Sequence, residues 1–286
     1  MGSFTMQVGN AEIVALSDMN CTYPTALGEL WPNVPVADWR PYMERYPDTF
    51  DGEKMRLEIG CYLVRSQGQT ILIDTGYGPG PIDYIGGLRG ELMADLARKK
   101  VDPRDVNTVF LSHLHLDHVG WNTVDSGGKY VPTFPNARYL AHQADLDHFR
   151  KPEVQAASRY PYIAQCIEPL VDLGIFDTCS GDTDLTSELR ALHTPGHTPG
   201  HMSVLVSSQG EKAMIQGDVL IHPAQVTEEG WTPLFDGDSD ASVATRRKLL
   251  DQMEADGTTV VSCHFPAPGF GKIVRAKGKR YWQAGL

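Results

Sequence analysis

The chain has 286 residues, 41% of them hydrophobic, and a formal net charge of −11. This length and apolar content are enough to bury a large core, and we expect one domain over residues 1–286. The negative charge and the lack of any long Lys/Arg run exclude nucleic acid and an anionic membrane as main partners, because both require a positive surface. The expected partner is a small molecule.

The N-terminal residues contain no basic segment that leads into an apolar stretch, and no later run approaches the roughly 20 apolar residues of a membrane span. The five cysteines are odd in number and widely scattered, which suits reduced thiols better than disulfides. We therefore expect a soluble, cytoplasmic protein.

The N-terminal part of the chain alternates strand patterns with an irregular stretch. Residues 11–18, AEIVALSD, predict a strand, and residues 57–76, LEIGCYLVRSQGQTILIDTG, predict a hairpin. Between them, residues 22–55 lack sustained periodicity and are predicted to form a long irregular insert that covers a pocket.

The rest of the chain contains two blocks in which helical periodicity is followed by strand patterns. Helices are expected over residues 91–100, 143–151, 153–170 (interrupted by Pro161) and 240–257. Strands are expected over residues 107–112, 187–196, 202–208, 212–218 and 258–264, with a closing hairpin over 271–282. A pair of packed sheets flanked by helices accommodates this order.

Three histidines and an aspartate directly follow the expected strand at 107–112, in the sequence HLHLDH. His113 and His115 lie two residues apart, so an extended backbone places both imidazoles on one face, where they can reach one metal ion. Asp117 and His118 follow as the chain turns, and they can serve a second ion nearby. Imidazole nitrogens and carboxylate oxygens suit zinc, with cobalt, manganese or iron as substitutes.

Three further groups of possible ligands also follow strand patterns. In HTPGHTPGH, residues 193–201, the central His197 is the expected ligand, and His201 is expected to support it. Asp218 follows a glycine at a strand end, where a carboxylate can bridge two cations. His264 ends VVSCH, and the adjacent Cys263 is expected to point to the opposite side. If these strands lie side by side, their ends meet at one edge.

The motifs HLHLDH, TPGHTPGH, GDVL and SCHFP, with LIDTG upstream, together resemble the metallo-β-lactamase superfamily of dinuclear metallohydrolases over about residues 56–275. The resemblance implies an α+β fold, a four-layer αββα sandwich with metals at one edge. It also implies a ligand set: His113, His115 and His197 on one ion, Asp117, His118 and His264 on the other, and Asp218 between them. Asp74 would orient a ligand imidazole.

Two divalent ions lower the pKa of a shared water, so the expected nucleophile is a bridging hydroxide that attacks a carbonyl or phosphoryl centre. Asp117 or Asp218 is expected to carry a proton to the leaving group. The sequence is similar to the lactonase and methyl parathion hydrolase branch, which implies hydrolysis of a lactone or ester of a neutral small molecule, with organophosphates as side substrates. The alternatives are an aryl phosphotriester hydrolase, a β-lactam hydrolase and a non-catalytic metal-dependent binding protein.

The substrate pocket is the least readable part of the sequence. Similar lactonases place a tyrosine three residues after the bridging aspartate, whereas this chain has Ile221 there. Side chains near the ligand motifs are expected to line the pocket, with core or surface positions as the alternative: Trp121, His222, Trp231, Phe235 and Phe265. A homodimer formed through the N-terminal insert is a further hypothesis.

Overall fold

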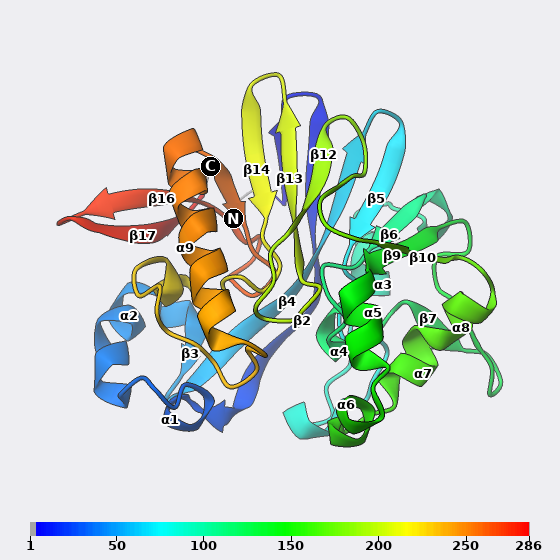
Figure 1. Ribbon diagram of the computed structural model, residues 1–286, viewed down its shortest axis with the longest axis horizontal. Coiled ribbons are helices and arrows are strands. Elements are labelled where there is room, and N and C mark those ends of the chain that lie inside the picture. The colour runs from blue at the N-terminus through cyan, green and yellow to red at the C-terminus, as the bar shows by residue number, and fades with distance from the viewer. Residues whose placement is uncertain (1–3, 286) are drawn as a thin grey trace.

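The computed structural model describes residues 4–285 and contains two large β-sheets packed against each other. Helix α9 lies against one outer side of the sandwich, and helices α3, α5, α7 and α8 lie on the opposite side (Figure 1). This α+β arrangement in four layers is the one that the sequence predicts. Among the described residues, none of the helices combines the length and apolar content that a membrane crossing requires.

The first sheet has eight strands, and its order along the hydrogen-bonded path is β1-β2-β4-β5-β6-β9-β10, with β3 paired to β4. Strands β1 to β5 pair antiparallel, whereas β5, β6, β9 and β10 pair in parallel. The bounds are β1 Thr5–Val8, β2 Ala11–Ala26, β3 Phe50–Asp51, β4 Lys54–Ser66, β5 Gln69–Ile73, β6 Thr108–Phe110, β9 Arg138–His142 and β10 Phe176–Cys179. The hairpin expected over residues 57–76 is confirmed as β4–β5.

The second sheet has seven strands in sequential order, and all neighbours pair antiparallel except β14 and β15, which are parallel. Its strands are β11 Thr183–Asp184, β12 Leu189–His193, β13 Met202–Ser208, β14 Glu211–Ile215, β15 Thr259–Val261, β16 Phe270–Ala276 and β17 Lys279–Ala284. A separate hairpin joins β7 (Thr123–Asp125) to β8 (Tyr130–Pro132).

Most of the helices are short. They are α1 Leu27–Leu30, α2 Arg40–Arg45, α3 Leu92–Arg98, α4 Leu116–Val119, α5 Gln143–Phe149, α6 Pro152–Ala157, α7 Tyr162–Cys166, α8 Glu168–Asp172 and α9 Ser239–Asp256. Helix α9 begins after Asp238, whose carboxylate accepts a hydrogen bond from the Ala241 amide at 2.9 Å, and ends at Gly257, which has a φ of 65°. Both ends therefore carry ordinary capping residues.

Alternating side chains of the inner strands fill different layers of the core. On β5, Ile71 and Ile73 pack between the two sheets, and Leu72 packs against the helical layer that contains Leu92 and Leu96 of α3. Because both faces of this part of the strand are buried, residues 71–73 are all apolar instead of alternating with polar residues.

Two sequence-based expectations are wrong in part. The insert at residues 22–55 is not wholly irregular: β2 continues to Ala26, short helical segments follow, and β4 begins at Lys54. The third helical pattern, residues 153–170, is interrupted at Pro161 as expected, but it forms three short helices instead of two, because Pro169 also cannot continue a helix from the preceding turn.

The strands that lead to the expected ligands belong to two sheets. Strand β6 lies in the first sheet, whereas β12, β14 and β15 lie in the second. The four strands therefore do not lie side by side in one sheet. Their ends still meet, because the two sheets pack face to face and the ligand-bearing loops leave both sheets at the same edge.

Candidate metal centre

The HLHLDH motif leaves β6 as a short extended segment and then enters α4, for which His115 is the residue before the first turn. Leu114 is fully buried in the helical layer, so His113 and His115 on either side of it point the other way. The Leu114 amide donates to Asp145 at 3.0 Å, and Asp145 also accepts hydrogen bonds from the loop that carries His197. One buried carboxylate thus ties the two histidine loops together.

Three imidazole nitrogens form a first donor group. His115 Nδ1 lies 3.0 Å from His113 Nε2 and 2.9 Å from His197 Nε2. The other nitrogen of His113 faces Ser112 Oγ at 3.1 Å, and that of His197 faces Asp236 at 2.9 Å. Because these outer contacts take the ring N–H, the inner nitrogens present lone pairs to one another, an arrangement that a cation between them stabilises.

A second donor group contains Asp117, His118 and His264. Asp117 Oδ2 lies 3.6 Å from His118 Nε2 and 3.7 Å from His264 Nε2. Nδ1 of His118 contacts Asp74 at 2.8 Å, and Nδ1 of His264 contacts the Glu58 carbonyl at 2.9 Å. His118 Nε2 is buried and has no hydrogen-bond partner among the described residues. A buried nitrogen without a hydrogen-bond partner needs an explanation, and binding to a metal ion would supply one.

Asp218 lies between the two groups. Its Oδ2 is 3.3 Å from His197 Nε2 and 3.2 Å from His264 Nε2, and its Oδ1 is 3.4 Å from His118 Nε2. The Asp218 amide donates to Nε2 of His201 at 2.9 Å, so His201 holds this turn instead of joining either donor group. Cys263, expected to point away, lies with Sγ 3.4 Å from Asp218 Oδ1.

The geometry agrees with comparisons to known proteins. A model of the metallo-beta-lactamase superfamily matches residues 59–264. This chain belongs to the metallo-beta-lactamase superfamily. Among curated relatives, an N-acyl homoserine lactonase from Bacillus sp is 28% identical over 219 residues, which cover 70% of this chain and 78% of the relative. An N-acyl homoserine lactonase from Bacillus cereus is 24% identical over 218 residues, covering 70% and 78%.

Solved structures of the superfamily superimpose over almost the whole chain. The hydrolase AbOPH has a TM-score of 0.83 at 26% identity and covers 98% of this chain and 96% of its own. The dizinc quorum-quenching lactonase AidC, solved with a homoserine product, has a TM-score of 0.80 at 24% identity and covers 99% and 97%. The protein is a metal-dependent hydrolase, and its two donor groups fit two metal ions.

The electrostatics of this metallo-beta-lactamase centre differ between the two donor groups. Burial lowers the pKa of His113 and His115 well below the ordinary value, which keeps both rings neutral. Burial also lowers the pKa of His118 and His264, but the Asp218 carboxylate outweighs it and raises both pKa values well above the ordinary one. The second donor group, together with Asp218, thus contains two carboxylates, and protons or a cation must balance their negative charge.

Sequence reasoning missed two residues that fix His197. Asp236, in the loop before α9, accepts from His197 Nδ1, and its second oxygen lies 3.4 Å from the guanidinium of the fully buried Arg246. Arg246 also donates to the carbonyls of Val219 at 2.8 Å and Trp231 at 2.9 Å. The segment FDGD gave no signal, because Asp236 and Asp238 stand alike in the sequence and only Asp238 is a helix cap.

A cavity of about 370 Å³ opens above the donor groups. Its wall includes Asp117, His115, His197, Asp218 and His264, together with apolar and phenolic side chains: Tyr23, Leu57, Tyr77, Tyr84, Leu116, Phe149, Val154, Tyr160, Tyr162, Ile221 and Phe235. The cavity therefore combines possible metal ligands at one end with a largely aromatic wall.

Of the aromatic side chains expected around the substrate, only Phe235 lies in this wall, and four expectations are wrong. Trp121 is held by a hydrogen bond of 2.7 Å from its Nε1 to Asp18, and Phe265 is fully buried against Trp282. Trp231 packs on Trp39 with ring centres 4.5 Å apart.

The fourth expectation concerns His222, which is a core residue. It is 1% exposed, its Nδ1 accepts from the Ala224 amide at 3.0 Å, and its Nε2 lies 2.7 Å from Thr49 Oγ1. Nearness in sequence to a ligand thus failed as a guide for these four residues, because the direction of each side chain is set by its packing or hydrogen-bond partners in the fold.

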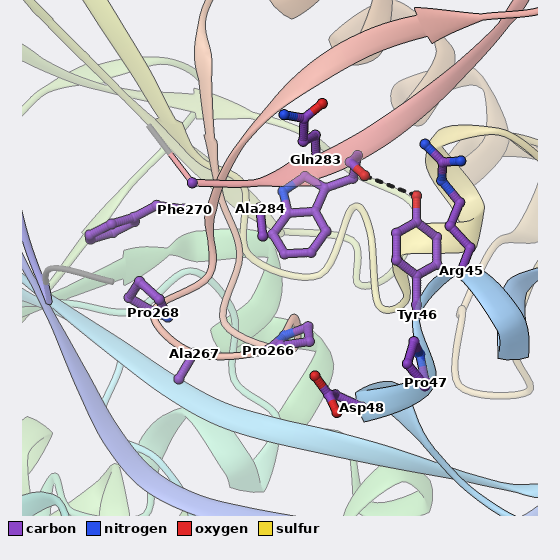
Figure 2. A pocket seen from close by; sticks show the side chains of 12 residues that line it. Arg45, Tyr46, Pro47, Asp48, Pro266, Ala267, Pro268, Phe270, Gln283 and Ala284 are labelled. Atoms are coloured by element: carbon purple, nitrogen blue, oxygen red, sulfur yellow. Dashed lines mark hydrogen bonds between the residues drawn. The ribbon is translucent and has the colours of Figure 1, made fainter. Parts of the chain in front are cut away.

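A second hollow, of about 730 Å³, lies between the 3₁₀ turn Pro47–Thr49, the loop 266–268 and β17 (Figure 2). The Tyr46 hydroxyl donates to the Trp282 carbonyl across it at 3.0 Å. Its charged lining residues are Arg45 and Asp48, and no histidine or cysteine lines it among the residues described. It therefore offers no set of metal ligands comparable with the first cavity.

Proposed function

We propose that this hydrolase binds two zinc ions and opens the ester bond of lactones. The observation that carries the proposal is the pair of donor groups that share Asp218 at the end of an aromatic cavity. The first ion would be held by His113, His115 and His197, and the second by Asp117, His118 and His264. Zinc suits this set of nitrogen and oxygen ligands, and cobalt, manganese or iron would serve as substitutes.

Two such ions supply Lewis acidity for the substrate carbonyl and a water of lowered pKa as the nucleophile. The side chains of the protein then have three tasks. Asp74 and Asp236 keep the N–H of His118 and His197 on the outer nitrogen, so the inner nitrogen stays free to bind. The aromatic wall excludes bulk water from the reacting carbonyl.

The third task is proton transfer to the leaving alkoxide. Asp218 is 4% exposed at its side chain and faces histidine nitrogens with both oxygens, whereas Asp117 is 21% exposed and its Oδ2 is the atom that faces the histidines. Asp117 Oδ1 is therefore the atom that we assign to carry the proton, and Asp218 is assigned to hold the two donor groups at a fixed separation.

The lactone is favoured over other carbonyl substrates by two observations. Relatives that cover about 70% of this chain are named N-acyl homoserine lactonases. In addition, Ile221 stands in the cavity wall at the position where the resemblance expects a tyrosine, so this part of the wall offers apolar contact to an acyl chain. An aryl phosphotriester is the second candidate, because Tyr23, Tyr84 and Phe235 present flat surfaces to an aryl group.

The test combines metal content with turnover. We expect two zinc ions per chain by elemental analysis and hydrolysis of N-hexanoyl-homoserine lactone that disappears with a chelator and returns with zinc. The Asp117→Asn variant should lose most of this activity, and Asp184→Asn, the same change at a surface ion pair with Arg190, should keep it. Faster turnover of an aryl phosphotriester than of the lactone would reverse the ranking, and a β-lactam is included as a third substrate. Failure on all substrates with both ions bound would favour a metal-dependent binding protein.

A further inference from the structure

One positive charge faces the cavity of the metal centre. Arg159, between α6 and α7, is the single Lys or Arg that lines this cavity within the described part of the chain. Its guanidinium carbon lies 5.4 Å from the centre of the Tyr84 ring. Within residues 4–285 it has no ion-pair partner. The chain has a net charge of −11, and several other arginines contact a carboxylate.

A row of rings connects the donor groups to Arg159. The ring centre of Phe235 lies 5.9 Å from that of His197 and 6.2 Å from that of Tyr23. The Tyr23 ring is in turn 6.5 Å from that of Tyr84, over which the guanidinium sits. All five side chains line the cavity. One wall therefore runs from a possible metal ligand, across three aromatic rings, to a cation.

The contact with Tyr84 places the exposed guanidinium, and none of its N–H groups donates to another described residue. A guanidinium carries five N–H donors, and an aromatic face attracts its charge without accepting those donors in the plane. A carboxylate meets the planar fork with two parallel hydrogen bonds, and because Arg159 is exposed at the cavity wall, a carboxylate can reach it without displacing a protein partner. The carboxylates in the cavity wall, Asp117 and Asp218, face the histidines instead.

We propose that Arg159 is an anion subsite, which selects lactones and esters whose acyl group ends in a carboxylate. The inference rests on the proposed hydrolytic function and names its substrate class. The scissile carbonyl lies at the donor groups, the hydrocarbon part of the acyl group runs along Phe235, Tyr23 and Tyr84, and the terminal carboxylate pairs with Arg159. This differs from the neutral substrate that the net charge of the chain suggests.

The first measurement uses substrates that differ only at the far end of the acyl chain. Mono-4-nitrophenyl esters of dicarboxylic acids with six, eight and ten carbons are compared with 4-nitrophenyl esters of the monocarboxylic acids of the same lengths. The quantity of interest is the ratio of kcat/KM for the two members of each pair. In Arg159→Ala we expect this ratio to fall about fivefold at the best-fitting length, mainly through KM, since this is the upper range for an exposed ion pair.

Two further variants separate a local contact from the general charge of the protein. Arg159→Lys keeps the charge but loses the planar fork, and should retain part of the ratio. Lys151→Ala removes an exposed cation from the same region outside the cavity, and should keep the wild-type ratio. A ratio that is equal in the wild type and Arg159→Ala at all three lengths would overturn the proposal, as would an equal fall in Lys151→Ala.

A binding experiment makes the inference independent of turnover. Isothermal titration of the zinc-loaded protein compares the sebacate dianion with decanoate, which has the same chain and one carboxylate. Tighter binding of sebacate that is lost in Arg159→Ala supports the subsite even when no ester is hydrolysed, in which case the proposed function alone fails. Equal binding of the two acids by the wild type refutes the subsite, even when the esters are hydrolysed.

Discussion

The Asp236→Asn substitution tests whether a hydrogen bond at the outer ring nitrogen of His197 keeps its inner nitrogen free to bind a metal ion. Asp236 joins two buried partners: its Oδ1 accepts from His197 Nδ1 at 2.9 Å, and its Oδ2 lies 3.4 Å from the Arg246 guanidinium. An asparagine has one oxygen and one NH₂ group. Because Arg246 can only donate, it takes the oxygen and turns the NH₂ toward His197. The imidazole must then accept at Nδ1 and carry its proton on Nε2, the nitrogen that faces the other histidines.

The expected consequence is weaker binding of one metal ion. Loss of a supporting partner of a ligand histidine typically lowers metal affinity by 10- to 100-fold, which corresponds to about 1.4–2.8 kcal/mol. The change should concern the ion held by His113, His115 and His197, and the second ion should be affected less. Competition with a chromophoric chelator measures both affinities, and the absorption spectrum of the cobalt-substituted protein reports the coordination of each site.

Asp238→Asn provides the matched control. It is the same substitution two residues away, and the asparagine can cap α9 as well as the aspartate does. Melting of both metal-free variants separates a loss of affinity from a loss of folding, since removing the negative charge beside the buried Arg246 also costs stability. Unchanged affinity for both ions in Asp236→Asn would refute the assignment of the His197 proton to Nδ1, and with it the role of Asp236.

Three further predictions follow from single residues. His118→Ala should reduce the zinc content after dialysis from two ions to one, as measured by elemental analysis, and retention of both would contradict the assignment of the second ion. Burial lowers the pKa of His222 to about 3, so the folded protein holds this ring neutral. The unfolded chain binds a proton there below its pKa of about 6.5, so the stability that is present above this pH is lost as the pH falls. In urea unfolding, the stability advantage of the wild type over His222→Asn should therefore shrink by about 1.4 kcal/mol per pH unit below 6.5. Gly217 has φ 56°, and a Cβ there would lie 2.5 Å from His201 Nε2, whereas a Cβ at Gly210, with φ 84°, would meet open space. Gly217→Ala should therefore lower the free energy of unfolding by about 1–3 kcal/mol more than Gly210→Ala does. Equal melting temperatures of the two variants would contradict this.

Several features of the site could be predicted from the sequence because they are local. The spacing of His113, His115 and His118 after an apolar strand fixes which rings share a face within a few residues. Strand and helix periodicity likewise located the β4–β5 hairpin and α9. These features depend on bond geometry and on alternation of apolar side chains, both of which are visible in a short window.

The cavity wall could not be predicted from the sequence, because its members come from distant segments. Tyr23, Tyr84, Arg159 and Phe235 lie far apart in the chain and carry no motif, yet they form one surface. Trp121, Trp231 and Phe265, which are near ligand motifs, point into the core instead. Proximity along the chain fixes where a backbone goes only until the next turn, and the direction of a side chain after that depends on packing.

The sequence by itself determined which residue types can bind metal ions, since imidazole and carboxylate chemistry does not depend on the fold. Only the tertiary structure decided how they are grouped. Strand β6 and strands β12, β14 and β15 belong to different sheets, and the packing of those sheets brings His113 to His197 and both to Asp218. The physical reason is that the hydrophobic core between the sheets sets their relative position, and the edge of that core is where the polar ligands meet.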